Sequence, residues 1–124
     1  MATVGNRVFD AGLNALDTEA NRVDICSQEP TSYAEATSTY TLGNTTSISI
    51  SAPTDGDTSG RKVTVAAISG ASVTGSGSAT HFAITDTTNS RLLITGALSS
   101  GGQTVTSGNT FALNALDIEI PDPS

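Results

Sequence analysis

The sequence predicts an all-β protein: a single antiparallel β-sandwich, immunoglobulin-like or jelly-roll-like, of about eight to nine short strands with a short N-terminal helix. The chain is rich in hydroxyl residues, with 20 Thr and 16 Ser, and the β-branched Thr favours strands. Apolar and polar residues alternate over short runs, as they do along a strand with one buried face. Turn-forming Gly, Asn and Ser residues separate those runs.

The length and the composition indicate one domain with a thin core. The chain has 124 residues and a mass of 12.5 kDa, with 36% hydrophobic and 4% aromatic residues and no Trp. A chain of this length fits a single hydrophobic core. We therefore expect residues 1–20 to form an N-terminal arm that belongs to the same domain as a β-sandwich at residues 21–124.

The best helix candidate covers residues 8–20. Val8, Phe9, Leu13, Leu16 and Ala20 recur there at helical spacing. This segment stands outside the series of strands and has one apolar side. A second, shorter helical turn is expected at residues 32–36, after a proline that can begin it.

Period-two runs predict the strands, at residues 21–27, 38–43, 47–52, 62–68, 71–74, 79–85, 91–97, 103–106 and 110–120. Strict alternation indicates a sheet with one buried and one solvent-facing side. The apolar phase changes between Ala115 and Leu116, which predicts a bulge or a strand that crosses between sheets.

The predicted joints between strands have the composition of turns. Residues 86–90, 99–102 and 107–109 are each expected to join two strands as a hairpin. The longest irregular stretch is Pro53–Gly60.

Charge and cysteine content exclude several classes of protein. The net charge is −7 with a pI near 4.2, and the five Lys and Arg residues are scattered. A nucleic-acid partner or an anionic membrane surface needs a basic face, so neither is expected. A lone Cys excludes an intrachain disulfide and a Cys-based zinc site, and it indicates synthesis in a reducing cytoplasm. The first residues lack the long apolar run of a signal peptide, and no later run is long enough to span a bilayer.

No catalytic residue is predicted. His81 is the only His, and a Ser–His–acid triad would have to use it. It lies in a strand pattern, opposite in phase to Phe82 and Ile84, which indicates a sheet-surface or half-buried side chain. Cys26 has no activating neighbour in the sequence and is interpreted as a buried, inert thiol. We therefore do not expect an enzyme.

The acidic turn at Asp55–Gly60 resembles the start of a calcium-binding loop, with oxygen-bearing residues at alternate positions. The twelfth position of such a loop needs a bidentate Glu, but here it is Ala66. The turn is interpreted as solvated, with no metal or cofactor. Tyr33 and Tyr40 are the only Tyr residues and, with no Trp present, the main candidates for stacking on a sugar, so a carbohydrate- or receptor-binding β module is one functional alternative.

Several segments carry a resemblance to a known group of proteins. They are GRKVTVAAI at 60–68, ATHFAITD at 79–86, NSRLL at 89–93, NTF at 109–111, and the opening stretches at 6–13 and 16–22. Together these segments resemble small proteins encoded in tailed bacteriophages and prophages, mostly of unassigned function. The resemblance covers nearly the whole chain and supplies no catalytic residues.

This resemblance implies a structural component of the virion, made in the host bacterial cytoplasm. The expected role is a capsid decoration or cement protein that binds the major capsid protein or other virion proteins as a homo-oligomer. A neck, collar or tail position is the alternative. Val8, Phe9, Leu13 and Leu16 are the candidate interface; alternatively, this segment covers an open face of the sandwich in its own chain.

Overall fold

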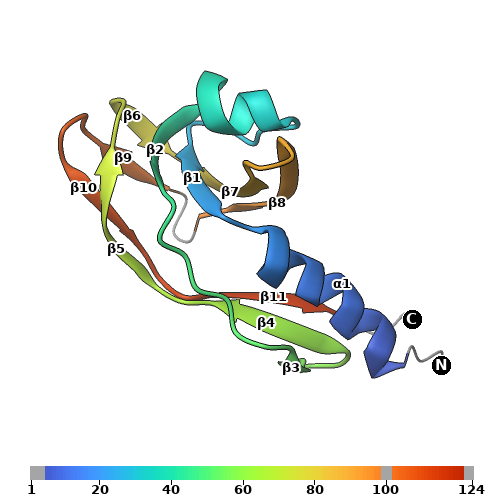
Figure 1. The fold of residues 1–124 in the computed structure, drawn as a ribbon. Helices are drawn as coiled ribbons and strands as arrows, with labels where there is room; N and C mark the ends of the chain where they lie inside the picture. The colour runs from blue at the N-terminus through green and yellow to red at the C-terminus, as the bar shows by residue number, and fades with distance from the viewer. Residues whose placement is uncertain (1–4, 99–101, 122–124) are drawn as a thin grey trace. The chain divides into compact units, whose positions relative to one another are not determined.

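The computed structural model describes residues 5–98 and 102–121, which form several antiparallel sheets and a short N-terminal helix (Figure 1). The elements are α1 (Asn6–Glu19), β1 (Arg22–Cys26), the π-helical segment η1 (Glu35–Thr39), β2 (Thr41–Thr45), β3 (Thr54–Asp55), β4 (Arg61–Val65), β5 (Ile68–Val73), β6 (Gly77–Ala79), β7 (His81–Asp86), β8 (Arg91–Ala97), β9 (Gln103–Val105), β10 (Thr110–Leu113) and β11 (Leu116–Ile120). The predicted all-β class with a short N-terminal helix is confirmed, and the antiparallel sheets are consistent with a sandwich-like fold.

The chain divides into two compact units. Unit 1 comprises Met1–Glu19, Ser49–Ala67 and Asn114–Ser124, and unit 2 comprises Ala20–Ile48 and Ile68–Leu113. The helix therefore belongs with strands from the middle and the end of the chain. The single-domain organisation expected from the sequence stays a prediction.

Unit 1 is a three-stranded antiparallel sheet, in the order β11-β4-β3, with α1 packed on one side. Val63 and Val65 on β4 are buried, and they pair with Ile118 and Leu116 on β11. The intervening residues of β4 carry the polar side of the sheet. The period-two prediction therefore holds here, because a single helix covers one face of this sheet.

Helix α1 lies within two residues of its predicted bounds. Its apolar side chains Phe9, Leu13 and Leu16 are buried, as a stripe at helical spacing requires. A Cβ placed on Gly12 would lie 3.9 Å from Ile120 Cδ1, so the helix passes close to the end of β11. An ion pair between Asp10 and Arg61 also joins α1 to β4, with Nε and Oδ1 2.8 Å apart.

Unit 2 contains a six-stranded antiparallel sheet, in the order β10-β5-β2-β1-β7-β8, and the pair β6-β9. Its central strands supply fully buried aliphatic residues, among them Val23, Ile25 and Ile84. Two glycines make room for aromatic rings. A Cβ on Gly96 would lie 2.6 Å from the Phe82 ring, and a Cβ on Gly43 would lie 3.0 Å from Phe111 Cε1 and 2.6 Å from the Ser72 carbonyl oxygen.

One of the three predicted hairpins is confirmed, and the other two are wrong. β7 and β8 pair across the turn at residues 87–90. However, β9 pairs with β6 and β10 pairs with β5, so residues 99–102 and 107–109 each join strands that are not partners. Of these joints, residues 99–101 lie outside the described residues. The reason is long-range pairing: β9 pairs with β6, and Thr110 and Phe111 of β10 pair with β5 in the same register, which shifts only between Phe111 and Leu113.

The predicted strand at residues 47–52 is wrong. The segment runs beside β4, but it forms only an isolated bridge between Ile50 and Val65. The Ser51 hydroxyl accepts a hydrogen bond from the Thr64 amide at 2.9 Å, which takes a donor away from a regular ladder. Pro53 follows and has no amide proton to donate.

The predicted phase change at residues 115–116 is confirmed as a crossing between sheets. β10 ends at Leu113 in the six-stranded sheet of unit 2, and β11 begins at Leu116 in the three-stranded sheet of unit 1. The expectation of one solvent-facing side is wrong for two strands. In β1 and β7, five-residue and six-residue strands respectively, every residue after the first is buried, because both faces of the sheet are covered there.

Candidate functional site

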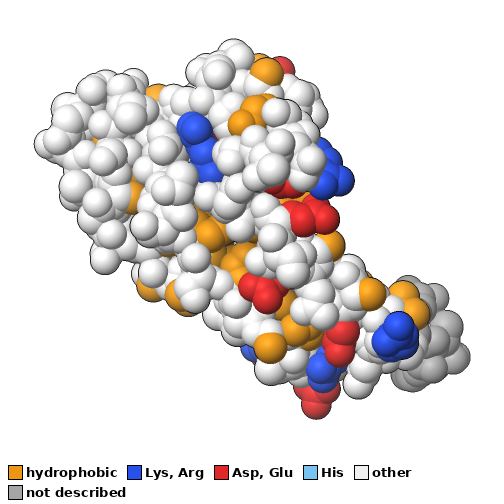
Figure 2. All heavy atoms as spheres, viewed as in Figure 1, with side chains coloured by type: hydrophobic (Ala, Val, Ile, Leu, Met, Phe, Trp, Pro, Cys, Tyr) orange, Lys and Arg blue, Asp and Glu red, His pale blue; other side chains and the backbone are white. Residues whose placement is uncertain are grey.

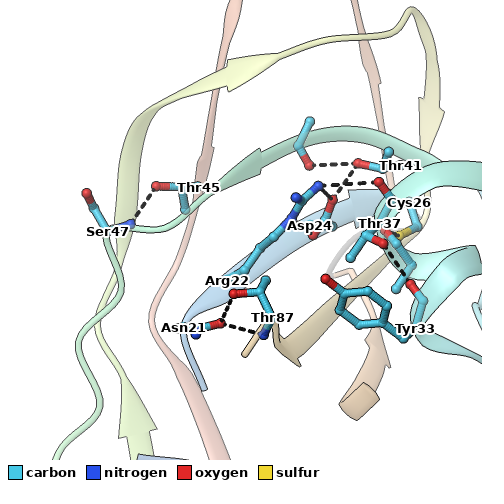
Figure 3. Close-up of polar contacts among 12 residues, drawn as sticks. Asn21, Arg22, Asp24, Cys26, Tyr33, Thr37, Thr41, Thr45, Ser47 and Thr87 are labelled. Atoms are coloured by element: carbon cyan, nitrogen blue, oxygen red, sulfur yellow. Dashed lines mark hydrogen bonds and ion pairs between the residues drawn. The ribbon is translucent and has the colours of Figure 1, made fainter. Parts of the chain in front are cut away.

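A buried group of polar side chains lies on β1. Arg22, Asp24 and Cys26 alternate along this strand and point to the side covered by η1 (Figure 3). Arg22 Nε lies 2.7 Å from Asp24 Oδ1, and Arg22 Nη2 lies 2.9 Å from Asp24 Oδ2. The Asp24 side chain is 0% exposed and the Arg22 side chain 22%. Arg22 and Asp24 therefore form a bidentate, charge-assisted ion pair that is largely shielded from solvent.

Two threonines complete the surroundings of this pair. The Thr41 hydroxyl donates to Asp24 Oδ2 at 2.6 Å, and Arg22 Nη2 donates to the Thr37 carbonyl at 3.4 Å. The hydrogen bond to Asp24, more than the opposing effect of burial, raises the pKa of the Arg22 guanidinium. The Asp24 carboxylate thus has three donors, so its buried charge is well satisfied.

Cys26 is the last residue of β1 and lies on the same side of the strand as Arg22 and Asp24. Its thiol is buried against the carbonyl of Ala36, with Sγ 3.7 Å from that oxygen. Burial, together with the nearby charge of Asp24, raises its pKa to about 12. The predicted burial of the thiol is therefore confirmed. Its inertness stays a prediction, which the raised pKa supports because the thiolate is the reactive species.

Local hydrogen bonds explain why the chain turns helically over β1. The Ser32 hydroxyl accepts from the Glu35 amide at 3.2 Å, while Glu35 Oε1 accepts from the Thr31 amide and hydroxyl at 2.8 Å each. This reciprocal arrangement resembles a capping box, and it lowers the pKa of Glu35. The helical turn predicted at residues 32–36 is confirmed: residues 33–34 are helical and continue into the π-helical segment η1 at Glu35–Thr39.

A second buried carboxylate holds the β7–β8 turn. Asp86 is 2% exposed, and its Oδ1 accepts from the amides of Thr88 and Asn89. Its Oδ2 accepts from the Asn89 side chain at 2.8 Å and from Arg91 at 3.4 Å. These bonds, the Asn89 side chain first, lower the pKa of Asp86. Asn21 accepts from the Thr87 amide at 2.9 Å and fixes the turn to the start of β1 (Figure 3).

The acidic turn of unit 1 is engaged by basic residues of the neighbouring strand. Arg61 lies 2.7 Å from Asp55, and Lys62 Nζ lies 2.6 Å from Asp57 and 3.1 Å from Asp117. The Asp57 amide also donates to Glu119. Hydrogen bonds with Asp57 and Asp117 raise the pKa of Lys62, and a bond from Thr64 is the largest cause of the lowered pKa of Asp117.

No constellation for catalysis is present around His81 in the described structure. The His81 side chain is half-buried, as predicted, and its Nδ1 lies 2.9 Å from the Thr80 hydroxyl. That hydroxyl also bonds the Ser27 carbonyl at 3.0 Å. The neighbours of His81 across the sheet are Cys26 and Ala97. None of these is a nucleophile held by a base and an orienting acid.

The four candidate interface residues divide into two groups. Phe9, Leu13 and Leu16 are buried within unit 1, whereas the Val8 side chain is 66% exposed. The alternative that this segment covers an apolar face of its own chain accounts for the first three. Of the four, Val8 alone is open to a partner. A shallow depression of about 460 Å³ also lies on α1, lined by Arg7, Asp10, Ala11 and Asn14.

The two Tyr residues lie on the segment that covers β1. Both are half-buried, and Tyr40 packs against the cluster of Cys26, Ala36 and Ala83 while its hydroxyl approaches Glu35 at 3.4 Å. Tyr40 thus serves the packing of unit 2. Basic side chains lie as separate spots on the face shown in Figure 2, and in neither unit do they gather there into a basic patch.

Residues 5–98 and 102–121 contain no group of three or more His, Cys, Asp or Glu side chains placed to hold a metal ion. No helix in this part of the chain is long and apolar enough to cross a membrane. Comparison with known protein families, curated proteins and solved structures found no significant match.

Sequence reasoning missed the roles of Asp24 and Asp86. Asp24 alternates with Val23 and Ile25, so it looked like a residue on a solvent-facing side. One signal was available: an Arg two residues away on the same side of a strand can reach a carboxylate in a bidentate pair. For Asp86, the run Asp-Thr-Thr-Asn after an apolar strand is typical of an Asx turn.

Proposed function

We propose that this protein is a structural, non-enzymatic component of a tailed-phage particle, a capsid decoration or cement protein that binds the assembled head. The proposal rests on the sequence segments at 6–13, 16–22, 60–68, 79–86, 89–93 and 109–111, which resemble small phage-encoded proteins. The side chains that could support chemistry agree with a structural role, since His81, Cys26 and Asp24 each take part in packing or in hydrogen bonds of the fold.

The outer side of α1 is the proposed contact with the shell. Val8 is the most exposed large hydrophobic residue described, and the shallow depression on the same helix combines Arg7 with Asp10 and Asn14. An apolar side chain next to polar groups of both signs is typical of the edge of a protein–protein contact. A protein of this kind contributes through contact free energy, which stabilises the assembled shell by mass action.

The proposal is tested on purified particles of the phage that encodes the chain. Immunoblotting should detect the protein in the particles, and quantitative mass spectrometry should give hundreds of copies per particle. About 6–12 copies would instead place it in the neck or tail, since those parts have cyclic symmetry. Absence from the particles would disprove a virion role.

The contact itself is tested with particles that lack the protein. Wild-type protein added back should cosediment with them, and Val8→Asp should reduce the bound amount at least about tenfold, since it places a charge in an apolar contact. Thr104→Asp, an exposed substitution on β9 in unit 2, is the matched control and should bind as wild type. Equal binding of the Val8 variant would remove α1 from the contact.

A further inference from the structure

The six-stranded sheet of unit 2 ends in a strand with an open edge. β8 pairs with β7 on one side and has no strand on the other among the described residues (Figure 1). With seven residues, it is the longest strand described. An unpaired edge presents a row of amide and carbonyl groups that can template pairing with another chain.

The other sheet edges in the described structure carry features that hinder such pairing. β3 has two residues and follows Pro53, and β6 and β9 have three residues each. β10 has four residues and an irregular register against β5. β11 carries Asp117 and Glu119, whose charges would oppose one another in a self-paired edge. Short length, charge and bulges are the usual protections of an edge.

β8 lacks most of these protections. After Arg91, the stretch Leu92–Leu98 reads Leu-Leu-Ile-Thr-Gly-Ala-Leu and contains no charged residue and no proline. The register against β7 shifts near Leu93, but it is regular from Ile94 to Ala97. Uncharged strands of this kind tend to associate when they are left open.

The hydrogen-bond pattern identifies which groups face outward. The Leu98 amide donates to the Thr80 carbonyl at 2.9 Å, so Leu98, and with it Gly96 and Ile94, direct their backbone groups to β7. The amide and carbonyl groups of Thr95 and Ala97 therefore point away from the sheet. Ala97 is exposed and Thr95 is half-buried, so both are accessible from the edge.

We propose that this edge binds the β8 edge of a second copy of the chain, antiparallel and about a two-fold axis at Gly96. Thr95 of each copy then lies opposite Ala97 of the other, and each of these two pairs exchanges two backbone hydrogen bonds. The strand is self-complementary in this register because it bears no charge, and Gly96 brings no side chain to the axis. An isologous contact of this type closes at two subunits.

The pairing is a property of the free chain and does not depend on the particle proposal. Sedimentation equilibrium of the wild-type protein should give about 25 kDa, twice the chain mass of 12.5 kDa, at micromolar concentration. A monomer at every concentration up to about 100 μM would overturn the proposal, and so would open-ended polymers, because a two-fold contact is closed.

A charge pair tests the register. Thr95→Lys with Ala97→Lys sets like charges opposite one another across the axis and should weaken dimerisation at least about tenfold. Thr95→Lys with Ala97→Glu differs only in the sign at an exposed position, sets opposite charges face to face, and should keep the dimer. Both variants place the same new ammonium group near Glu29, which in the wild type accepts from the Thr95 hydroxyl at 3.2 Å, so this contact does not distinguish them. Circular dichroism should show the wild-type β spectrum for both. Equal dimerisation of the two variants, or loss of the dimer in both, would overturn the assignment.

Discussion

The contribution of the Arg22–Asp24 ion pair to stability is tested most directly by replacing Arg22. In Arg22→Met, the Asp24 carboxylate keeps the Thr41 hydroxyl and loses both guanidinium donors, now 2.7 and 2.9 Å away. Removing one partner of a fully buried ion pair costs about 3–5 kcal/mol. The Arg22 side chain is 22% exposed, so water can reach part of the site, and we expect the lower end, about 3 kcal/mol.

A loss of that size is easy to measure, because the whole free energy of unfolding of a small domain is about 5–15 kcal/mol. Urea unfolding followed by far-UV circular dichroism should show a midpoint lower by about 2 M, for a denaturant slope of about 1.5 kcal/mol/M. Replacing both charges, as in Arg22→Met with Asp24→Leu, should recover most of the loss, since apolar residues of similar volume replace a buried pair at little cost. The Thr41 hydroxyl then still has the Gly43 carbonyl at 3.3 Å.

The control is an ion pair in contact with solvent. Lys62→Met in unit 1 removes the partner of Asp57 and Asp117, whose side chains are 67% and 44% exposed. Water replaces the lost contacts there, so the midpoint should move far less than for Arg22→Met. A cost of under about 1 kcal/mol for Arg22→Met, or a double variant as unstable as the single one, would contradict the desolvation of this ion pair.

Three further predictions concern acid, thiol chemistry and packing. The pKa of Asp86 is lowered in the fold, so the stabilisation by its carboxylate is present above the ordinary pKa of 3.8 and is lost as the pH falls through the folded value. Between pH 6 and pH 3, the Asp86→Asn variant should therefore lose less free energy of unfolding than the wild type. Equal losses would contradict the contacts at this turn. The pKa of Cys26 is raised from 9.0 to about 12, so the folded protein should not react with a disulfide reagent at pH 8. Its free energy of unfolding should fall as the pH rises from 9 toward 12. Rapid labelling without denaturant would show that the thiol is accessible in the folded protein. In Gly96→Ala the new methyl would lie 2.6 Å from the Phe82 ring and should cost about 1–3 kcal/mol in thermal unfolding, while Gly5→Ala, with no atom within 4 Å, serves as the neutral control.

Alternation was a reliable guide where a sheet has one covered face. In β4 and β11 the apolar residues Val63, Val65 and Ile118 face α1, and the polar residues between them form ion pairs on the opposite side. The helix was equally predictable, because its stripe of Phe9 and Leu13 fits only a helical period. Both signals are local, so each could be recognised without knowing what lies beside it.

Pairing between distant strands was not predictable in this way. The turn at 86–90 joins paired strands because Asp86 satisfies its amides locally. The turn at 107–109 has similar composition, yet its Asn109 carbonyl accepts from the amide of Val73, far back in the chain. Turn residues permit a reversal of direction, but the partner of each strand depends on long-range contacts that a turn does not encode.

The ion pair of Arg22 and Asp24 on β1 also helps to determine the register of this strand in the sheet. A slip of β1 by one residue would turn Arg22 and Asp24 into the aliphatic side of the sheet and Val23 toward η1, because neighbouring strand residues face opposite sides. An apolar strand could tolerate such a slip with modest loss, whereas a charged pair moved away from Thr37 and Thr41 would be left desolvated and unsatisfied. We therefore expect the variant with Arg22→Met and Asp24→Leu to keep most of its stability but to populate more than one strand register. Its NMR spectra should then show broadened amide resonances of η1. Sharp resonances throughout η1 in that variant would show that packing alone determines the register.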